Sequence, residues 1–341
     1  MNIALITPAR PVAHSGNRNT AERWATLLRE LGHRVRTQTK WDGKAADVMI
    51  ALHARRSHES IARFAAALPG RPLVVMLTGT DLYADIRIDT AAKLSLKLAT
   101  RLVILQDEGL SELLPSLRPK TRVIYQSTQI VKKPPPLKTK FEVCISGHLR
   151  EVKDPFRLAS ALGHLPKQSR VRVTQIGGAM SPSMREDAQR WMRHEPRYHW
   201  MGEVPHGTAL KRLARSRLMV ISSRMEGGAN VVTEALAARV PVIASRVSGN
   251  IGMLGKDYAG YFPFGNERAL ASVLWRAESD AAFYSLLQRQ CRERCGLTRR
   301  SREKNALRLL MRELESCSVN SRRRATRAPA QKYAGERRTR R

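Results

Sequence analysis

The segment that decides the fold reads SSRMEGGANVVTEALAARVPVIAS and spans residues 222–245. The apolar run RLMVISS at 217–223 predicts a buried strand, and PVIAS at 241–245 predicts a second one. Between them, NVVTEALAARV at 230–240 has the spacing of a helix. A strand, a turn, a helix and a second strand in this order are the unit of a doubly wound parallel sheet.

The same alternation extends over the rest of the chain. Further strands are predicted at 2–7, 33–38, 47–53, 72–81, 101–106, 122–127, 141–147, 170–178 and 198–204. Helices are predicted at 20–33, 56–68, 107–117, 154–165, 184–194 and 206–216, and mainly helical chain at 267–315. The sequence therefore predicts an α/β protein with two Rossmann-like, doubly wound parallel-sheet domains that face a cleft, plus C-terminal helices.

Residues 127–140, STQIVKKPPPLKTK, interrupt this alternation. Three consecutive prolines and four lysines predict a stiff, exposed linker. We therefore expect an N-terminal domain at 1–126 and a C-terminal domain with its helices at 141–318. The remainder, 319–341, is rich in arginine and poor in aliphatic residues, which predicts a disordered basic tail.

The charge of the chain is strongly positive. Lys and Arg number 61 against 29 Asp and Glu, which gives a formal net charge of +32. Such a chain attracts polyanions, so an RNA-binding protein on a Rossmann scaffold is one alternative function, and deleting 319–341 should then abolish salt-sensitive RNA binding. No RNA-recognition motif, KH loop or zinc knuckle accompanies the tail, so we expect no specific nucleic-acid partner. The same charge suits an anionic small substrate.

The cellular compartment is predicted from three features: membrane spans, a signal peptide and disulfides. No apolar run reaches the roughly 18 residues that a membrane span requires. The start, MNIALITPAR, has neither the basic region nor the long apolar region of a signal peptide. Four cysteines are too few for a disulfide scaffold, so we expect free thiols and a cytoplasmic protein.

The turn between the predicted strand and helix at 217–240 has the parts of a phosphate site. Gly227 and Gly228 let the backbone approach a ligand closely and permit positive φ. A helix that begins near Asn230 directs its free N–H groups and its dipole at the turn, where an anion binds. Glu226 and Glu234 lie on either side of this anion site. In a bound nucleotide sugar, Glu226 would then lie near the sugar and Glu234 near the ribose. The structural alternative is that Glu234 is an exposed helix residue and Glu226 a helix cap.

This segment resembles the donor-binding segment of GT-B glycosyltransferases of the large retaining family with an E-x7-E motif, and the resemblance extends to about residue 315. It implies that Glu226 lies near the transferred sugar, that Glu234 holds the ribose, and that N–H groups of the turn meet the diphosphate. In SGHLREVKDP at 146–155, Lys153 matches the family's lysine, whereas His148 stands at its arginine position and Arg150 follows two residues later. The implied catalytic candidates are Glu226, Lys153 and Arg150, and the implied donor-binding residues are Gly147, His148, Gly227, Gly228, Ala229, Asn230, Val231 and Glu234.

The first domain carries the acceptor candidates. AHSGNRNTAERW at 13–24 matches the family's glycine-containing loop, and Arg18 in it is suited to an anionic acceptor. In LTGTDLYADI at 77–86, Thr78, Thr80 and Asp81 are expected to face the cleft. His53 ends a predicted strand, where its side chain either faces the cleft or makes a structural hydrogen bond. The acceptor and cleft candidates are Gly16, Asn17, Arg18, His53, Thr78, Thr80 and Asp81.

Four stretches are more specific than the general family pattern: MNIALITPA followed by SGNR, LTGTDLY, SGHLREVKDPFR and MEGGANVV. Together they resemble the selenosugar synthases of selenoneine biosynthesis. The resemblance implies that a sugar passes from a UDP-sugar, such as UDP-N-acetylglucosamine or UDP-glucose, to selenophosphate and that a C–Se bond forms. A GT-B glycosyltransferase with a hydroxyl acceptor on a sugar, lipid or small metabolite is the alternative. No cofactor or metal is expected, because GT-B enzymes generally need none and no Asp-x-Asp pair stands in the right place.

Overall fold

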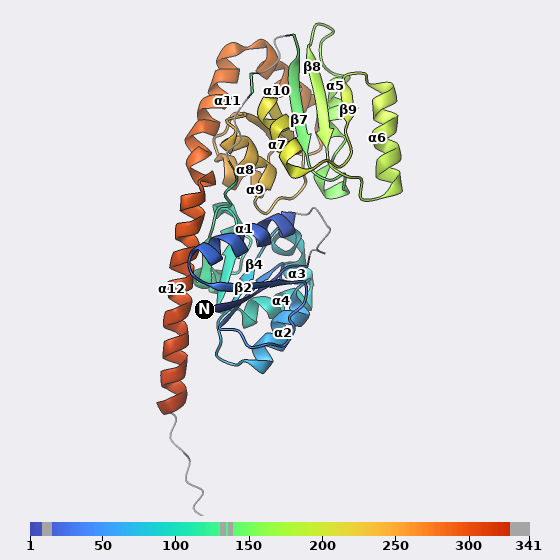
Figure 1. Ribbon diagram of the computed structural model, residues 1–341. Helices are drawn as coiled ribbons and strands as arrows, with labels where there is room; N and C mark the ends of the chain where they lie inside the picture. Colours follow the sequence, from blue (N-terminus) through green and yellow to red (C-terminus); the bar gives the residue numbers. More distant parts are fainter. Residues whose placement is uncertain (9–15, 130–133, 136–138, 328–341) are drawn as a thin grey trace, which may run out of the picture.

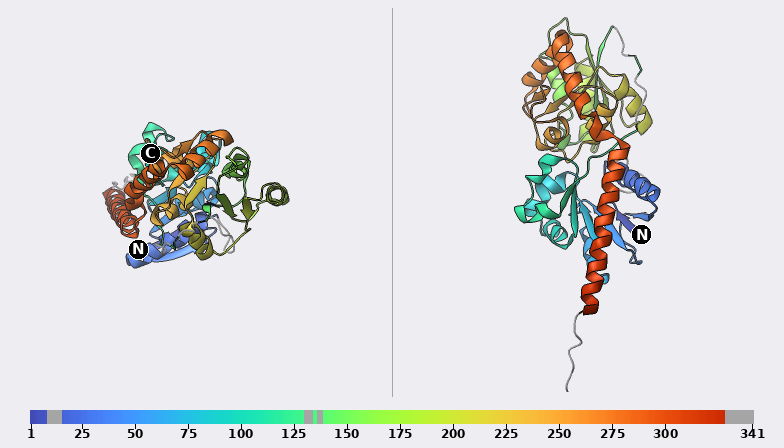
Figure 2. Two further views of the ribbon diagram at one scale, coloured as in Figure 1. Left: turned by 90° about the horizontal axis from the view of Figure 1, so that it is seen from above. Right: turned by 90° about the vertical axis from the view of Figure 1, so that its left-hand side faces the viewer.

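The computed structural model describes residues 1–8, 16–129, 134–135 and 139–327. They form two α/β domains placed end to end, and the long helix α12 (Arg300–Arg327) runs from the second domain along the side of the first (Figures 1 and 2). Residues 130–133 and 136–138 of the predicted linker and 328–341 of the predicted tail lie outside the described residues.

The first domain contains a six-stranded, fully parallel sheet with the strand order β2-β1-β3-β4-β5-β6. Its strands are β1 (Asn2–Ile6), β2 (Arg34–Gln38), β3 (Val48–Leu52), β4 (Leu73–Met76), β5 (Arg101–Ile104) and β6 (Thr121–Val123). Its helical elements are α1 (Gly16–Glu30), α2 (His58–Ala67), η1 (Asp81–Asp85), α3 (Ile86–Ile88), α4 (Thr90–Leu98), η2 (Asp107–Leu110) and η3 (Pro115–Lys120). Every residue of β3 and β4 is buried, as expected for central strands covered on both faces.

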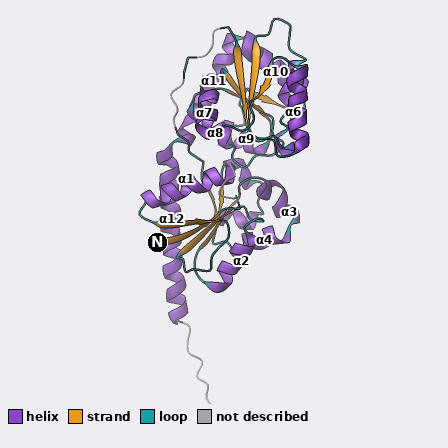
Figure 3. Cartoon of the chain, turned by 45° about the vertical axis from the view of Figure 1, so that its right-hand side comes forward, coloured by secondary structure: helices purple, strands orange, loops and turns teal. Residues whose placement is uncertain are grey.

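The second domain repeats this plan with the strand order β12-β11-β10-β7-β8-β9, again fully parallel. Its strands are β7 (Phe141–Ser146), β8 (Val171–Ile176), β9 (Tyr198–Trp200), β10 (Leu218–Ile221), β11 (Val242–Ser245) and β12 (Tyr261–Phe262). Its helical elements are η4 (Glu151–Lys153), α5 (Arg157–Leu162), α6 (Pro182–His194), α7 (His206–Arg215), α8 (Asn230–Ala237), α9 (Ser248–Leu254), α10 (Glu267–Ser279), α11 (Ala281–Arg294) and η5 (Cys295–Thr298). Helices lie around the sheet of each domain (Figure 3). The predicted fold class is confirmed.

The strand orders fix where loops from different strands meet. In the first sheet the order reverses between β1 and β3, and in the second sheet it reverses between β7 and β10. In open parallel sheets, ligands bind outside the carboxyl ends of the strands at such a reversal. The loops after β1, β3, β7 and β10 therefore define the expected binding region.

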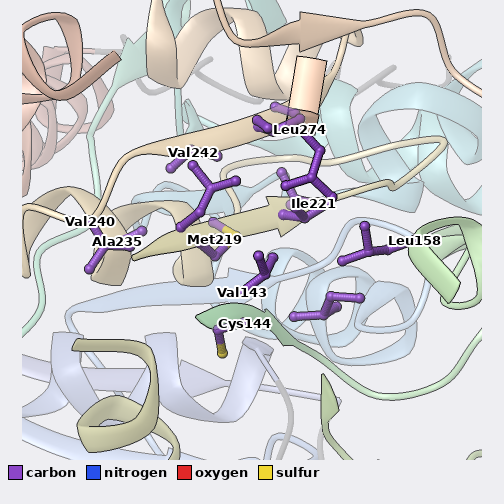
Figure 4. Packing of buried hydrophobic residues seen from close by; sticks show 14 of the residues in the cluster. Val143, Cys144, Leu158, Met219, Ile221, Ala235, Val240, Val242 and Leu274 are labelled. Atoms are coloured by element: carbon purple, nitrogen blue, oxygen red, sulfur yellow. The ribbon is translucent and has the colours of Figure 1, made fainter. Parts of the chain in front are cut away.

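Each domain has its own apolar core. In the second domain, Val143, Met219, Ile221 and Val242 of the sheet pack together with Leu274 of α10 and its neighbours (Figure 4). In the first domain, separate clusters cover the two faces of the sheet. None of the helices that the structure describes combines the length and the apolar character that a membrane crossing needs.

Helix α12 belongs to the core of the first domain, although the sequence placed residues 300–318 with the second. Four buried side chains of α12 pack against α1 and the first sheet: Leu307, Leu310, Met311 and Leu314. They recur every three or four residues, so they form one apolar stripe on the helix. The helix also continues to Arg327, so it includes residues 319–327 of the segment that composition predicted to be disordered.

Further elements also differ from the sequence prediction. Residues 107–120 form the short 3-10 helices η2 and η3 in place of one helix, because Pro115 and Pro119 cannot continue an α-helical hydrogen-bond ladder. Helix α1 begins at Gly16, before the predicted start at residue 20. The helical elements η1, α3, α4, η4 and α9 and the strand β12 were not predicted at all.

Candidate active site

A cleft of about 840 Å³ lies between the two domains, at the carboxyl ends of both sheets. Segments after β1, β3, β4, β5 and β6 form the wall on the first domain, and segments after β7, β8, β9 and β10 form the wall on the second. The predicted candidates that line this cleft are Gly16, Asn17, His53, Thr78, Thr80, Gly147, His148, Arg150, Lys153, Glu226, Gly227, Gly228, Ala229, Asn230, Val231 and Glu234. The candidates absent from its lining are Arg18 and Asp81.

Residues 226–231, which we call the Gly-Gly turn, connect β10 to α8. The backbone N–H groups of Ala229, Asn230 and Val231 form no hydrogen bond with any described residue, and all three residues line the cleft. The N–H groups of Val232 and Thr233 are already bonded to the carbonyl of Ala229. Free N–H groups at a helix N-terminus, together with the helix dipole, make this end of α8 suited to an anion.

The two glycines of the turn have a different role from the predicted one. A Cβ atom on Gly227 would lie 2.3 Å from the carbonyl oxygen of Thr78, and one on Gly228 would lie 2.5 Å from Cβ of Leu105. Neither glycine has positive φ. The glycines are therefore required because the turn packs directly on the first domain, so the close partner of their backbone is the other domain.

Glu226 and Lys153 meet in the cleft. The ammonium of Lys153 donates to Oε1 of Glu226 at 2.5 Å, and the hydroxyl of Ser223 donates to the same oxygen at 2.5 Å. The side chain of Glu226 is only 7% exposed and that of Lys153 is 31% exposed, so water reaches the ion pair mainly from the lysine side. Lys153 ends η4, and the next residue, Asp154, takes a left-handed conformation with φ 43° that ends this short turn.

Arg150 supplies a second cation on the same wall. It lines the cleft and forms no ion pair with any carboxylate that the structure describes. Its guanidinium is therefore free to bind an anion, in contrast to the ammonium of Lys153, which already has a carboxylate partner. That Arg150 supplies the charge of the family's arginine in place of His148 stays a prediction.

Glu234 has a partner that sequence reasoning missed. Its carboxylate lies 2.8 Å from Nε2 of His206, the first residue of α7, and His206 also lines the cleft. The hydrogen bond to this carboxylate raises the pKa of His206. The side chain of Glu234 is 11% exposed, which contradicts the alternative of an exposed helix residue.

His53 lies at the end of β3 in the wall on the first domain. Its backbone has φ 71°, which is rare for a residue with a side chain, and its ring is buried with Nε2 at 3.2 Å from the hydroxyl of Thr80. Burial lowers the pKa of His53 and favours the neutral imidazole. His53 thus both lines the cleft and makes the hydrogen bond of the structural alternative.

Two acceptor candidates take other positions. Arg18 forms an ion pair with Glu22, one turn further along α1, at 2.5 Å. Asp81 is fully buried, and its carboxylate accepts hydrogen bonds from the backbone N–H groups of Ala54, Thr78 and Gly79. The expectation that Asp81 faces the cleft is wrong, because its oxygens are used to fix the loops after β3 and β4.

Arg56 is the cation that sequence reasoning missed on this wall. It lines the cleft three residues after His53, and among the described residues it has no ion-pair partner. Nothing in the local sequence RRSHES separates it from the neighbouring Arg55, which pairs with Asp85 at 3.0 Å. Within the part of the chain that the structure describes, Arg56 and Arg150 therefore place a cation without an ion-pair partner on each wall.

Two Rossmann-like domains, a cleft at the carboxyl ends of both sheets, and a helix N-terminus with cations beside it define the GT-B architecture of glycosyltransferases. Residues 126–294, almost the whole second domain, match the family described as Glycosyl transferases group 1. This match covers just under half of the chain, and it includes the Gly-Gly turn together with Arg150 and Lys153.

Individual proteins are also similar to this chain in structure or in sequence. HepE of Anabaena, solved in complex with UDP and glucose, is similar with a TM-score of 0.71 and 15% identity, over 93% of this chain and 100% of that one. Sucrose-phosphate synthase of Thermosynechococcus elongatus is similar with a TM-score of 0.74 and 17% identity, over 92% of this chain and 99% of that one. The Glycosyltransferase 1 domain-containing protein 1 of Xenopus tropicalis is 24% identical over 276 residues, which are 73% of this chain and 80% of the relative.

The described residues contain no group of three or more His, Cys, Asp or Glu side chains that is arranged to hold a metal ion. The three cysteines at 144, 291 and 295 are free thiols. Independence from a metal cofactor stays a prediction.

Proposed function

We propose that the protein transfers a sugar from a UDP-sugar to an anionic acceptor, selenophosphate. The observation that supports the donor most strongly is the set of free N–H groups of Ala229, Asn230 and Val231, which share one cleft with Arg150 and with Glu234. Structures of HepE with UDP, with UDP and glucose, and with UDP-glucose support the same kind of donor in a protein of this fold.

In this proposal the second domain holds the donor. Glu234 accepts hydrogen bonds from the ribose hydroxyls, and the N-terminus of α8 binds the diphosphate. Arg150 and Lys153 neutralise the charge that grows on UDP as the bond to the sugar breaks. Glu226, which is held by Lys153 and Ser223, orients the sugar.

The first domain supplies the acceptor site. Arg56 offers an uncompensated positive charge near His53 and Thr80, and this favours an acceptor that carries negative charge. The selenium atom of selenophosphate is already anionic and soft, so it attacks without a strong general base. Its electron pair forms the C–Se bond at the anomeric carbon, the C–O bond to UDP breaks, and UDP leaves with that bonding pair. Water then cleaves the P–Se bond and releases phosphate, which leaves the selenosugar.

The second candidate function keeps the donor and uses a hydroxyl acceptor. It is favoured by His53, because its lowered pKa leaves the imidazole neutral and able to take the proton of an attacking hydroxyl. Selenophosphate needs no such proton acceptor, so the two functions make different demands on His53. A His53→Gln variant should retain activity with selenophosphate and lose it with a hydroxyl acceptor.

The test is incubation of the protein with a panel of UDP-sugars and selenophosphate, followed by mass spectrometry for the selenium isotope pattern. We expect a selenium-containing sugar with at least one donor, and no such product when inorganic phosphate replaces selenophosphate. Absence of selenium from the products of every donor would overturn the acceptor proposal. Release of UDP only in the presence of a hydroxyl compound would favour the second function. The proton coupling at the anomeric carbon of the product tests the retaining outcome that the resemblance implies.

Two arginine variants test the acceptor site. Arg56→Ala should raise the KM for selenophosphate and leave the Kd for UDP unchanged, because Arg56 belongs to the wall opposite the Gly-Gly turn. Arg193→Ala, an exposed arginine on α6, is the matched control and should change neither value. Equal KM values for the two variants would show that Arg56 does not contribute to acceptor binding.

A further inference from the structure

A row of buried hydrogen bonds connects the first domain to the Gly-Gly turn through Gln126. The side chain of Gln126 is nearly fully buried at the rear of the cleft. Its Oε1 accepts from the hydroxyl of Thr20 at 2.6 Å and from Nη2 of Arg23 at 2.5 Å, both on α1. Its Nε2 donates to the carbonyl oxygen of Gly228 at 2.6 Å. Gln126 thus links α1 to the turn of the other domain, in addition to the direct contact at 3.5 Å between the amide of Asn230 and the carbonyl oxygen of Gly16.

The chemistry of the partners fixes the orientation of this amide. Arg23 can only donate a hydrogen bond, and the carbonyl of Gly228 can only accept one. The oxygen of Gln126 must therefore face Arg23 and its nitrogen must face Gly228. No other orientation satisfies both partners, and no apolar side chain satisfies either.

Helix α12 holds Arg23 in turn. The carboxylate of Glu303 is fully buried and accepts from Nε of Arg23 at 3.0 Å and from the indole N–H of Trp24 at 2.9 Å. It also accepts from the backbone N–H and the hydroxyl of Ser127, the residue after Gln126, at 2.8 and 2.5 Å. Glu303 thus fixes both Arg23 and Ser127, the residue that follows Gln126, so Gln126 has little freedom to move.

We propose that Gln126 is a positioning residue for the diphosphate of the donor. The carbonyl of Gly228 and the N–H of Ala229 belong to one planar trans peptide, in which they point in opposite directions. By holding this carbonyl, Gln126 fixes the direction of the Ala229 N–H and the entry into α8. This inference rests on the proposed function only in that the bound anion is taken to be the diphosphate of a nucleotide.

The decisive variant is Gln126→Glu. It keeps the shape of the side chain and strengthens the contact with Arg23, so the fold should survive. It replaces the donor to Gly228 by a carboxylate oxygen, which repels the carbonyl at this distance and displaces the turn. The matched control is Gln290→Glu on α11, because the amide of Gln290 also donates to a backbone carbonyl, that of Asp257 at 3.0 Å, outside the cleft.

The measurements are the Kd for UDP by calorimetry, the Tm, and hydrogen–deuterium exchange of residues 225–236. For Gln126→Glu we expect a Kd about tenfold higher or more, faster exchange in that segment and a Tm close to that of the control. For Gln290→Glu we expect a Kd within about twofold of the wild-type value, because it lies outside the site.

The outcomes separate this inference from the proposed function. If the wild-type protein does not bind UDP, the proposed donor is wrong and the inference falls with it. If the wild-type protein binds UDP and Gln126→Glu binds it equally well with unchanged exchange, the inference alone is wrong. Should Gln126→Glu not fold, Gln126→Met, which fills similar space without a charge, is judged by the same Kd and exchange values.

Discussion

Replacing Glu303 by alanine should destabilise the first domain and detach α12 from it. The carboxylate is fully buried, and its loss would leave the guanidinium of Arg23, the indole N–H of Trp24 and the N–H of Ser127 without their partner. Breaking a buried ion pair by removing one partner costs about 3–5 kcal/mol. Each further unsatisfied donor adds about 1–3 kcal/mol when water cannot reach it, and partial hydration of the vacated space offsets part of this. We therefore expect a loss of about 4 kcal/mol.

For a domain of about 150 residues, such as the first, 1 kcal/mol corresponds to about 2–4 °C in Tm, so Glu303→Ala should lower the Tm of this domain by roughly 10 °C. Circular dichroism during heating measures this directly. Glu315→Ala is the matched control, because Glu315 is exposed on the same helix, forms no ion pair with a described residue and acts on His33 through its charge without a hydrogen bond. The Tm of this variant should change by less than about 2 °C. Equal Tm values for the two variants would refute the view that Glu303 anchors the helix.

The remaining predictions concern the wall of the cleft on the second domain. Glu234→Ala should raise the KM for the donor about 10–100-fold with a smaller change in kcat. The reason is that the lost hydrogen bonds to the carboxylate already exist in the bound substrate, before the reaction begins. Steady-state kinetics measures both values. Lys153→Ala should lower kcat about 100-fold, since its charge matters most as UDP leaves, and an unchanged kcat would contradict that role. The pKa of His206, followed by NMR, should lie above about 6.5 in the wild-type protein and fall toward that value in Glu234→Gln. Because the folded pKa is raised, the stabilisation from this pair is complete below about pH 6.5 and is lost as the pH rises through the folded pKa, so the Tm difference between wild type and Glu234→Gln should disappear at high pH.

The parts of the site that the sequence predicted are those set by local pattern. The buried run before Glu226 and the helical spacing after Asn230 define a strand-to-helix turn without any knowledge of the rest of the chain. The side chains of Glu226, Lys153 and Glu234 line the cleft because the turns that carry them follow strands that meet at the order reversal of one sheet.

The parts that were missed depend on contacts between distant segments. Nothing near His206 indicates that it meets Glu234, because the pairing arises only when α7 packs beside α8. Gly227 was expected to let the backbone approach a ligand, whereas its close neighbour is the carbonyl of Thr78 in the other domain, which no local sequence pattern specifies. The apolar stripe of α12 likewise predicts a buried helix face without specifying which domain buries it.

The return of α12 to the first domain means that the chain passes between the domains twice, once near Ser127 and once near Arg299. These two chain connections permit the domains to rotate relative to one another about the line that joins the connections, and they oppose rotation about any other axis. The apolar stripe of α12 also makes the first domain discontinuous in sequence, because it needs residues from both ends of the chain. A fragment cut within 127–140 would expose the surface that Leu307, Leu310, Met311 and Leu314 cover, so the two halves of this protein should be soluble together and aggregate when made apart.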